Sequence, residues 1–274
     1  MDEVRRCGVL GDPVAHSLSP VLHRAAYAAT GLAWEYDAHR VAAGGLAAFL
    51  AGLDPTWRGL SLTMPLKREA VALADSLSET ARLAGAANTL VLGEGEVEGH
   101  NTDVPGAEAA LAERGVRSVR EATILGGGAT ATSAGLALVN RGAASLTLLV
   151  RDPDRATATV AALRAHPATP EVRVDALGQG PVGGDVVVST IPAAAQTEDL
   201  VARCAPVPAV FEVVYDPWPT PLAAAARRRG QVLVSGLDLL VHQAAVQFGL
   251  FTGLVAPLAV MREAGERALR DRAG

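Results

Sequence analysis

The sequence predicts an α/β protein with a doubly wound parallel sheet in its second half. An apolar run that begins at Ala122 ends abruptly in three glycines, and a small-residue helix pattern follows at once. Further apolar runs then alternate with helical segments, at residues 145–150, 171–176, 185–188, 209–214 and 231–235. Such alternation is typical of parallel sheets that carry helices on both faces. With 274 residues, the chain has room for one large or two moderate domains.

The three glycines form the most informative turn of the chain. Gly126 and Gly128, with Ala131 in the third position, fit the G-x-G-x-x-G/A spacing of dinucleotide-binding turns. Backbone N–H groups between Gly126 and Ala129, Gly127 included, are expected to cradle a pyrophosphate at the helix N-terminus, where the macrodipole favours negative charge. Because the chain has 28 glycines, an ordinary strand-to-helix turn is the alternative.

The residues after the second strand of this unit favour NADP over NAD. Arg151 stands where an NAD-binding unit carries an acid, and an arginine there can hold a 2′-phosphate. Arg155 is within reach of the same corner, and Asp152 is expected to cap the next helix. Thr190 follows another strand at its carboxyl end, where open α/β sheets bind ligands.

Composition excludes several classes of function. A net charge of −5 argues against nucleic acid as the main partner, since phosphate binding needs an excess of cations. The acidic N-terminus does not resemble a signal peptide, and no apolar stretch reaches the ~20 residues of a membrane span. Cys7 and Cys204 have neither metal nor redox spacing, which indicates a reducing compartment. A cytoplasmic protein without a bound metal is expected.

The first third of the chain offers two serines near a predicted helix start. A strand at residues 8–10 precedes them; Ser19 before Pro20 predicts an N-cap, and Gly31 closes the helix. Ser17 has no such duty, and two hydroxyls converging on a helix N-terminus suit a small carboxylate. His16 and His23 lack acidic or nucleophilic neighbours in their motif, so structural roles are expected for both.

Lys67 is the strongest catalytic candidate among the charged residues of this part. Strands are predicted at residues 34–41 and 60–63, with a short helix at 46–53 between them. A helix from Leu66 onward would place Lys67 in its first turn, which is the unfavourable end for a cation. A solvated lysine beside Arg68 is the alternative. A cation just after a strand end suits proton-transfer chemistry.

In the remaining segments, spacing alone does not decide whether two residues have a functional or a structural role. Ser78 caps a helix that Gly85 ends, a hairpin turns at residues 93–95, and a helix spans 105–114. Asn88 and Asp103 flank the hairpin, and each could simply cap a turn or a helix. From Leu237 the chain is helical, with interruptions expected at Gly249 and Gly253.

Together these motifs resemble the shikimate dehydrogenase family, almost from end to end. The family's G-x-P-x-x-H-S-x-S-P-x-x-H is found at residues 11–23, and its N-V-T-x-P-x-K corresponds to residues 61–67. Its G-A-x-N-T is residues 85–89 and its G-x-N-T-D residues 99–103. The glycine turn, residues 214–222 and residues 236–243 complete the order. Each motif is modest, but seven in the family's order are specific.

The resemblance implies an NADPH-dependent reduction of 3-dehydroshikimate to shikimate, in the biosynthesis of aromatic amino acids. It implies a substrate domain, residues 1–102 completed by residues 237–274, and a Rossmann-like NADP-binding domain, residues 103–236. The catalytic pair would be Lys67 and Asp103. Ser17 and Ser19 would hold the substrate carboxylate with Tyr215 nearby; Thr63, Asn88 and Gln243 would bind ring hydroxyls. Gly126, Gly127, Gly128, Ala129, Arg151, Arg155, Thr190 and Gly236 would bind NADP(H).

Three positions depart from the family pattern. Ser61 replaces an asparagine, which would loosen one substrate hydrogen bond; Arg24 replaces another on a helix. Val150 replaces an asparagine that contacts adenosine. An NAD-dependent quinate/shikimate dehydrogenase, with Asp152 pairing the ribose, is the nearest rival. A non-catalytic sensor of shikimate-like ligands is another, although Lys67 and Asp103 argue against it. The chain is expected to be a monomer or homodimer.

Overall fold

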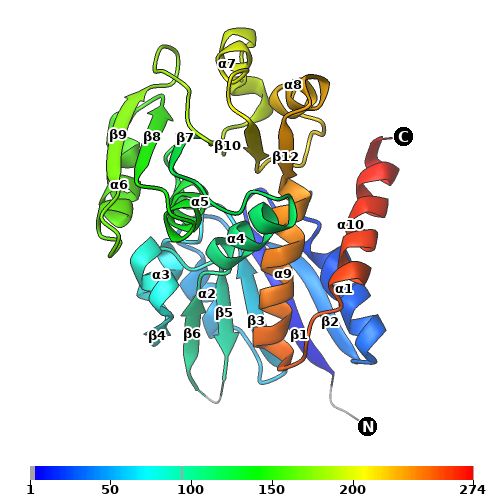
Figure 1. Ribbon diagram of the computed structural model, residues 1–274. Helices are drawn as coiled ribbons and strands as arrows, with labels where there is room; N and C mark the ends of the chain where they lie inside the picture. The colour runs from blue at the N-terminus through cyan, green and yellow to red at the C-terminus, as the bar shows by residue number, and fades with distance from the viewer. Residues whose placement is uncertain (1–3, 94, 274) are drawn as a thin grey trace. The chain divides into compact units, whose positions relative to one another are not determined.

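Strands and helices alternate through most of the protein, in agreement with the predicted α/β class (Figure 1). The computed structural model describes residues 4–93 and 95–273. The chain divides into two units. Unit 1 comprises Met1–Thr102 and Leu240–Gly274, and unit 2 comprises Asp103–Leu239.

Unit 1 contains a mixed six-stranded sheet in the order β2-β1-β3-β5-β6-β4. The half formed by β2, β1 and β3 is parallel, because β1 pairs in parallel with both of the others, whereas β5 runs antiparallel to β3 and β6. The strands are β1 (Arg5–Gly11), β2 (Trp34–Arg40), β3 (Trp57–Leu62), β4 (Ser76–Leu77), β5 (Thr89–Leu92) and β6 (Val97–His100).

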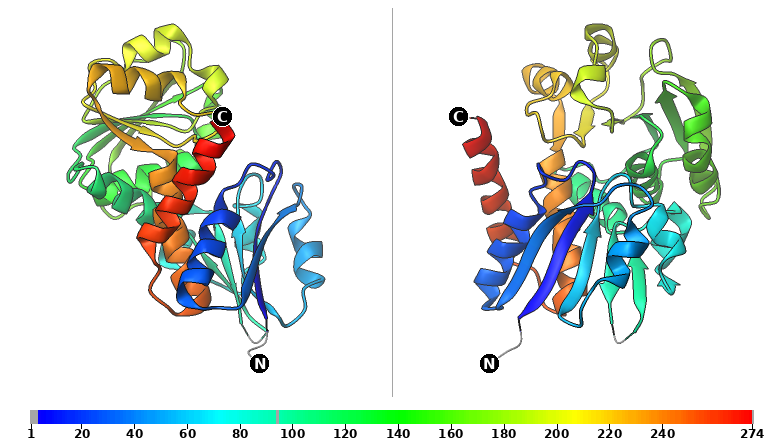
Figure 2. Two further views of the ribbon diagram at one scale, coloured as in Figure 1. Left: turned by 90° about the vertical axis from the view of Figure 1, so that its right-hand side faces the viewer. Right: turned by 180° about the vertical axis from the view of Figure 1, so that it is seen from behind.

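Helices cover both faces of this sheet (Figure 2). One face packs on Leu46 of α2 and Ala81 of α3 through the strand residues Leu10, Leu60 and Leu90. The opposite face meets α1 and α9, and α10 packs on α1. The helices are α1 (Ser19–Thr30), α2 (Leu46–Ala51), the 3-10 helix η1 (Glu69–Ala72), α3 (Glu79–Ala84), α9 (Gly236–Thr252) and α10 (Leu258–Ala273).

Unit 2 contains a fully parallel sheet in the order β12-β11-β10-β7-β8-β9. Strands are added outward from β7 in one direction and from β10 in the other, which is the doubly wound order that the sequence predicts. The point where the direction reverses lies between β7 and β10. The strands are β7 (Glu121–Leu125), β8 (Ser145–Val150), β9 (Glu171–Ala176), β10 (Val186–Ser189), β11 (Ala209–Glu212) and β12 (Val232–Ser235).

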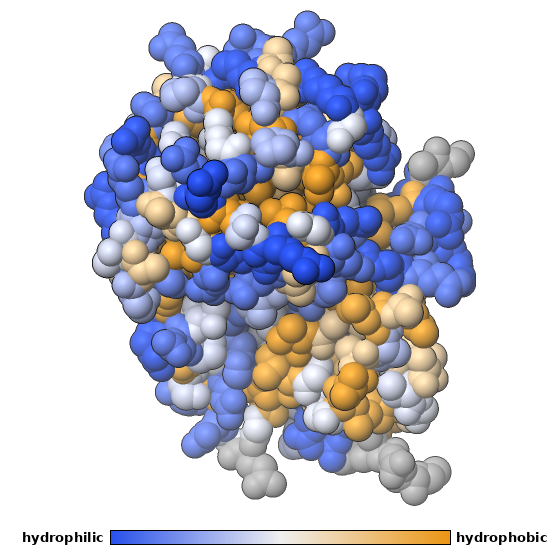
Figure 3. All heavy atoms as spheres, in the orientation of Figure 1, coloured by the Kyte–Doolittle hydropathy of each residue, from blue (hydrophilic) through white to orange (hydrophobic). Residues whose placement is uncertain are grey.

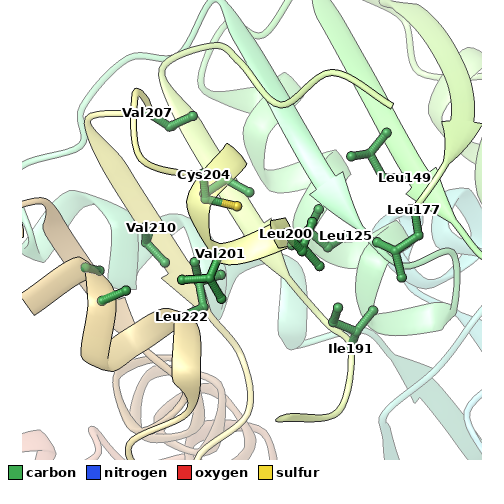
Figure 4. Close-up of a cluster of buried hydrophobic side chains, with 13 residues drawn as sticks. Leu125, Leu149, Leu177, Ile191, Leu200, Val201, Cys204, Val207, Val210 and Leu222 are labelled. Carbon is green, nitrogen blue, oxygen red and sulfur yellow. The ribbon is translucent and has the colours of Figure 1, made fainter. Parts of the chain in front are cut away.

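The two faces of this second sheet bury different strand residues. Leu125, Val187 and Val210 pack against α7 and α8, which contribute Leu200 and Leu222 to the same cluster (Figure 4). Ile124 faces the other way, toward α5, where Gly135 allows a close approach. The helices of the unit are α4 (Asp103–Glu113), α5 (Ala129–Asn140), η2 (Pro153–Ala156), α6 (Thr157–Arg164), η3 (Ala193–Ala195), α7 (Glu198–Arg203) and α8 (Pro221–Arg229).

The C-terminal helices differ from the prediction in one respect. α9 continues through Gly249 without interruption and ends at Thr252, before Gly253, which is in the left-handed region at φ +72°; residues 253–257 join it to α10. A single glycine weakens a helix by about 1 kcal/mol, which the packing of neighbouring side chains can offset. Phe248 and Phe251, on either side of Gly249, are both buried and supply that packing.

The surface over α9 and α10 carries exposed apolar side chains. Figure 3 shows apolar atoms gathered where these helices lie in Figure 1. Val246 and Leu254 are more than a third exposed, and Val255, between the two helices, is 93% exposed. None of the helices among the described residues combines the length and apolar character that crossing a lipid bilayer requires.

His23 lies in an aromatic cluster between α1, β2 and α9. Its ring stacks on Tyr36 with centroids 4.2 Å apart, and Phe251 lies 5.9 Å away. Neither ring nitrogen has a hydrogen-bond partner within 3.5 Å among the described residues. Burial lowers the pKa of His23 to about 3, although Gln247 lies close enough to oppose the shift. The imidazole is therefore neutral in the folded protein, as a structural role requires.

We expect this histidine to make stability depend on pH. The unfolded chain binds a proton at His23 below its ordinary pKa of 6.5, whereas the folded protein does so only near pH 3. The free energy of unfolding should therefore fall as the pH drops from 6.5 toward 3, with a slope of up to about 1.4 kcal/mol per pH unit from this residue. Urea denaturation of the wild type and of His23→Phe, between pH 4 and 7, measures the difference.

The matched control is His16→Gln, because His16 is exposed whereas His23 is buried. It should reproduce the wild-type slope. Equal slopes for the wild type and His23→Phe would show that His23 does not titrate differently in the two states.

Candidate functional site

The residues that the sequence singles out in unit 1 lie at one edge of its sheet. β1 and β3 are parallel, so the loops after Gly11 and Leu62 leave the sheet at the same end. β5 is antiparallel to β3, and its first residue Thr89 pairs with Ser61 and with His100, the last residue of β6. The segments that carry the predicted site residues of unit 1 before Thr102 therefore meet at one edge: Ser17 and Ser19, Thr63 and Lys67, and Asn88.

Backbone hydrogen bonds tie these loops together. The Thr63 N–H donates to the Leu10 carbonyl at 2.9 Å, and the Leu62 N–H donates to the Asn88 carbonyl at 2.7 Å. Gly11 permits this approach, because a Cβ there would lie 2.3 Å from Cγ2 of Thr63. The glycine of the first motif is thus explained by the position of Thr63.

Asn88 is the centre of a buried network of hydrogen bonds. Its side chain is 2% exposed, and its Oδ1 accepts from the Thr102 N–H at 2.7 Å and from the Thr89 hydroxyl at 3.0 Å. Its Nδ2 donates to Thr102 Oγ1 at 2.9 Å and to Gln243 Oε1 at 3.2 Å. Because a buried amide without partners costs about 1–3 kcal/mol, these contacts fix the carboxamide in one orientation. The structure thus brings Asn88 and Gln243 together.

The start of α1 differs from the prediction at its two serines. Ser19 is the first residue of α1 and makes no capping hydrogen bond, so the predicted N-cap is wrong. Ser17 instead accepts the Ser19 N–H at 3.2 Å. The reason is that α1 starts at Ser19, which leaves its hydroxyl beside Tyr36. Arg272 of α10 holds the same loop by donating to the His16 carbonyl at 3.0 Å.

Lys67 does not lie in the first turn of a helix, so that expectation is also wrong. Residues 64–68 form a turn, and the regular structure that follows is the short 3-10 helix η1. The carbonyl of Lys67 accepts the Ala87 N–H at 2.8 Å, and Leu66 beside it is fully buried. These contacts fix the backbone of Lys67 next to the segment that carries Asn88. The Lys67 side chain is half-buried.

Asp103 follows Thr102 directly and is the first residue of α4. Its side chain is 6% exposed, which is unusual for a carboxylate. Asp103 therefore lies within the helix and is not its N-cap. Thr102, which sequence reasoning missed, holds this point of the chain through its hydrogen bonds to Asn88. The G-x-N-T-D motif was the sequence signal that could have identified Thr102.

The glycine turn of unit 2 has the geometry of an anion cradle. Gly126 has φ +114°, and a Cβ there would lie 2.3 Å from Thr190 Oγ1, so only glycine fits. Gly128 is the N-cap residue of α5, and nothing lies within 4 Å of the Cβ position there. The Thr159 hydroxyl donates to the Gly127 carbonyl at 2.8 Å. Thr159 thus fixes the Gly127 carbonyl, and the N–H groups at the start of α5 are available to a phosphate.

Thr190 closes the same corner from the neighbouring strand. Its hydroxyl donates to the Leu125 carbonyl at 2.9 Å, which places it against Gly126 where the strand order reverses. Ligands of doubly wound sheets bind at this switch point. The turn of residues 126–129 and Thr190 are therefore brought together by the fold.

The charged residues after β8 form a second, exposed corner. Asp152 caps η2 by accepting the Asp154 N–H at 3.1 Å, as predicted, and lies 3.5 Å from Arg155. The carboxylate of Asp152 is thus already engaged. Arg151, at the carboxyl end of β8, is exposed. Its guanidinium at this corner is a group that suits a phosphate.

A buried carboxylate that sequence reasoning missed organises the loop of Tyr215. Glu212, fully buried at the end of β11, accepts from Gln196 Nε2 at 2.7 Å, Thr220 Oγ1 at 2.9 Å and the Val214 N–H at 3.1 Å. Burial raises its pKa, and these hydrogen bonds oppose the shift. Only the position of Glu212 at a strand end, before the rigid loop, could have signalled this role.

Gly236 begins α9 under a steric constraint. A Cβ at this position would lie 2.2 Å from the Val213 carbonyl oxygen, in the loop that leads to Tyr215. Asp238 accepts from Arg114 and from the Ser235 N–H at 2.8 Å, which fixes the start of the helix. Within residues 4–93 and 95–273, no group of three or more His, Cys, Asp or Glu side chains is arranged to hold a metal ion.

Comparison with known proteins gives consistent matches over nearly the whole chain. Residues 9–90 match the family profile of the shikimate dehydrogenase substrate binding domain, and residues 236–264 match that of the shikimate 5′-dehydrogenase C-terminal domain. The chain is 37% identical to the shikimate dehydrogenase (NADP(+)) of Moorella thermoacetica, over 97% of this chain and 92% of that protein.

Two solved structures share the fold. The shikimate dehydrogenase of Mycobacterium tuberculosis superposes with a TM-score of 0.87 at 38% identity, covering 96% of this chain and 99% of that one. The shikimate 5-dehydrogenase of Thermus thermophilus, solved with NADP(H) and shikimate, has a TM-score of 0.81 at 31% identity, covering 97% and 100%.

Two glycine substitutions should separate folding from nucleotide binding. Gly128→Ala should leave the melting temperature almost unchanged, since its Cβ position is open and its backbone angles suit alanine. It should weaken NADPH binding at least about tenfold, because a methyl group would occupy the space of the anion. Gly126→Ala should instead destabilise the protein by about 1–3 kcal/mol. Thermal denaturation and fluorescence titration with NADPH measure the two effects.

Wild-type affinity for NADPH in Gly128→Ala would mean that the pyrophosphate does not lie on this turn. A normal melting temperature in Gly126→Ala would contradict the close contact with Thr190.

Proposed function

The chain belongs to the shikimate dehydrogenase family, and we infer that it reduces 3-dehydroshikimate to shikimate with NADPH in the biosynthesis of aromatic amino acids. The identity of 37% to an NADP-dependent shikimate dehydrogenase across almost the full length of both chains carries this conclusion. The protein is an oxidoreductase with a small-molecule substrate. The rival readings, an NAD-dependent quinate enzyme and a ligand sensor, have no comparable support.

Lys67 and Asp103 are assigned here as the catalytic pair. Bound NADPH supplies the hydride that adds to the ketone carbon of the substrate. Negative charge then develops on the carbonyl oxygen, where the Lys67 ammonium would stabilise it and donate a proton. Such general acid assistance contributes about 10²–10⁴-fold to the rate. The buried carboxylate of Asp103 would orient the ammonium and the new hydroxyl group.

The hydroxyl and amide groups at the sheet edge of unit 1 suit the rest of the substrate. Ser17 and Ser19, at the start of α1, are proposed to hold the carboxylate, helped by the helix dipole and by Tyr215. Thr63, Asn88 and Gln243 are proposed to bind the ring hydroxyls. The hydrogen bond between Asn88 and Gln243 supports this, because it places two amides side by side at this edge.

NADP(H) fits the residues present in unit 2. Gly126, Gly127, Gly128 and Ala129 would bind its pyrophosphate, with Thr190 and Gly236 near the rest of the cofactor. Arg151 and Arg155 would pair with the 2′-phosphate. The open Cβ position of Gly128 supports the first assignment. The exposed guanidinium of Arg151 supports the preference for NADPH, as do the NADP-dependent relatives.

We also propose a cytoplasmic enzyme that acts as a monomer or homodimer. Cys7 and Cys204 are both buried and unpaired, which suits a reducing compartment. Burial raises the pKa of the Cys7 thiol to about 12 and that of Cys204 to about 11, so neither is a reactive thiolate.

Replacing the catalytic lysine tests the reaction directly. Lys67→Ala should lower kcat at least about 10²-fold, because its charge acts mainly in the transition state. The dissociation constant for shikimate should change by no more than about tenfold. Oxidation of NADPH with 3-dehydroshikimate, followed at 340 nm, measures the rate, and calorimetry measures binding.

Arg68→Ala is the matched control, because Arg68 is the exposed neighbouring cation. Its activity should equal that of the wild type. Unchanged turnover in Lys67→Ala would remove the mechanism, and a wild type inactive on 3-dehydroshikimate would remove the function.

Cofactor choice is tested at Arg151. Arg151→Ala should raise the KM for NADPH about 10- to 100-fold, which corresponds to the loss of a charge-assisted hydrogen bond of about 1.5–3 kcal/mol. The KM for NADH should stay within about twofold, since NADH lacks the 2′-phosphate. Arg173→Ala, an exposed arginine of the same unit, is the control. An equal loss with both cofactors would place the 2′-phosphate elsewhere.

A further inference from the structure

α9 meets the sheet of unit 1 at three successive levels. Phe251 covers Gly59, where a Cβ would lie only 2.1 Å from its ring. One turn earlier, Gln247 contacts Ser61, and one turn earlier again Gln243 contacts Asn88. Four helical residues rise about 6 Å and two strand residues about 6.6 Å, so the step from Phe251 to Gln247 nearly matches the step from Gly59 to Ser61. Asn88 precedes Thr89, the β5 partner of Ser61, and so lies one residue farther along the sheet. The position of Gln243 along the sheet thus depends on the two contacts below it.

Gln247 makes the middle contact of this series, and both the oxygen and the nitrogen of its amide form hydrogen bonds. Its side chain is 1% exposed. Oε1 accepts from the Ser61 hydroxyl at 2.9 Å, while Nε2 donates to Thr89 Oγ1 at 2.9 Å and to the Asn88 carbonyl at 3.4 Å. The side chain of Gln247 therefore joins α9 to β3 and to β5, two neighbouring strands that end near the predicted ring-binding amides.

The direction of each hydrogen bond is set by its neighbours. Tyr36 donates to Ser61 Oγ at 2.6 Å, so the single Ser61 hydrogen goes to Gln247. Gln247 donates to Thr89, so the Thr89 hydrogen goes to Asn88 Oδ1. Asn88 is thereby left with its Nδ2 toward Gln243. Two backbone groups set this direction, because the Asn88 carbonyl can only accept from Gln247 Nε2 and the Thr102 N–H can only donate to Asn88 Oδ1.

We propose that Gln247, through Ser61 and Thr89, is a positioning residue for Gln243 and Asn88, and so determines affinity for the substrate ring. The consequence for substrate rests on the proposed function. Gln243 Oε1 accepts from Asn88 and Thr102, and its Nε2 donates one hydrogen to the Leu240 carbonyl at 3.3 Å, which leaves the second Nε2 hydrogen for a ligand hydroxyl. If Gln247 no longer holds α9, this edge shifts relative to Asn88. The Ser61 hydroxyl, committed to Gln247, cannot donate to the substrate itself.

The test replaces the amide by an apolar side chain of similar shape. Gln247→Met should raise the KM for 3-dehydroshikimate and the dissociation constant for shikimate about tenfold, with kcat within about threefold and the KM for NADPH within about twofold. The matched control is Gln231→Met. Gln231 is a partly buried amide of unit 2 that donates to the carbonyls of Cys204 and Val207. This control should lower the melting temperature without changing either KM.

A second readout follows the position of Gln243 without any substrate. Its side-chain amide signal in a ¹⁵N–¹H spectrum, assigned by its loss in Gln243→Met, should move in Gln247→Met and stay in place in Gln231→Met. An unmoved signal together with an unchanged substrate KM would overturn the proposal, since Gln247 would then be merely structural.

Ser61→Ala decides the matter if Gln247→Met does not fold, because it breaks the same link from the other end. A raised KM for 3-dehydroshikimate supports the proposal, and an unchanged one contradicts it. If the wild type neither binds shikimate nor reduces 3-dehydroshikimate, the proposed function fails, and the Gln243 signal alone decides the positioning role.

Discussion

The candidate substrate site depends on the buried hydrogen bonds of the Asn88 carboxamide. Removing such a group from water is unfavourable unless every donor and acceptor finds a partner. Here the partners come from three segments: the adjacent Thr89 on β5, Thr102 after β6, and Gln243 on α9, which lies 155 residues away in the sequence. The need to satisfy one amide therefore brings a strand, a loop and a C-terminal helix together, and makes the sheet edge rigid.

The nucleotide-binding unit is governed by a steric constraint instead. Gly126 adopts a backbone conformation that side chains rarely reach, and Thr190 fills the space where its Cβ would be. The two strands that end here, β7 and β10, are the ones from which the sheet winds in opposite directions. This is why a short glycine turn, rather than a charged side chain, marks the expected cofactor site.

The two units thus prepare different kinds of chemistry by the same means. In each, backbone groups at strand ends are fixed first, by Thr63 and Asn88 in one and by Thr159 and Thr190 in the other. The proposed reacting groups, Lys67 above all, are side chains attached to this frame. Hydride transfer tolerates little misplacement, so the precision of this frame matters more than the number of charged residues near it.

The sequence by itself determined the α/β class, the doubly wound second half, and the residues of each motif. Strand and helix periods and the φ preferences of glycine are local properties, which a sequence displays directly. It placed Ser19 and Lys67 wrongly, because a helix start or a turn such as residues 64–68 depends on what the neighbouring loops contact. Gln247 could not be found from spacing, since its partner Ser61 lies 186 residues away. Thr102 and Glu212 have nearer partners, but no local pattern shows that their side chains are buried. Only the tertiary structure decided which buried polar groups satisfy one another, because burial is a property of the folded chain.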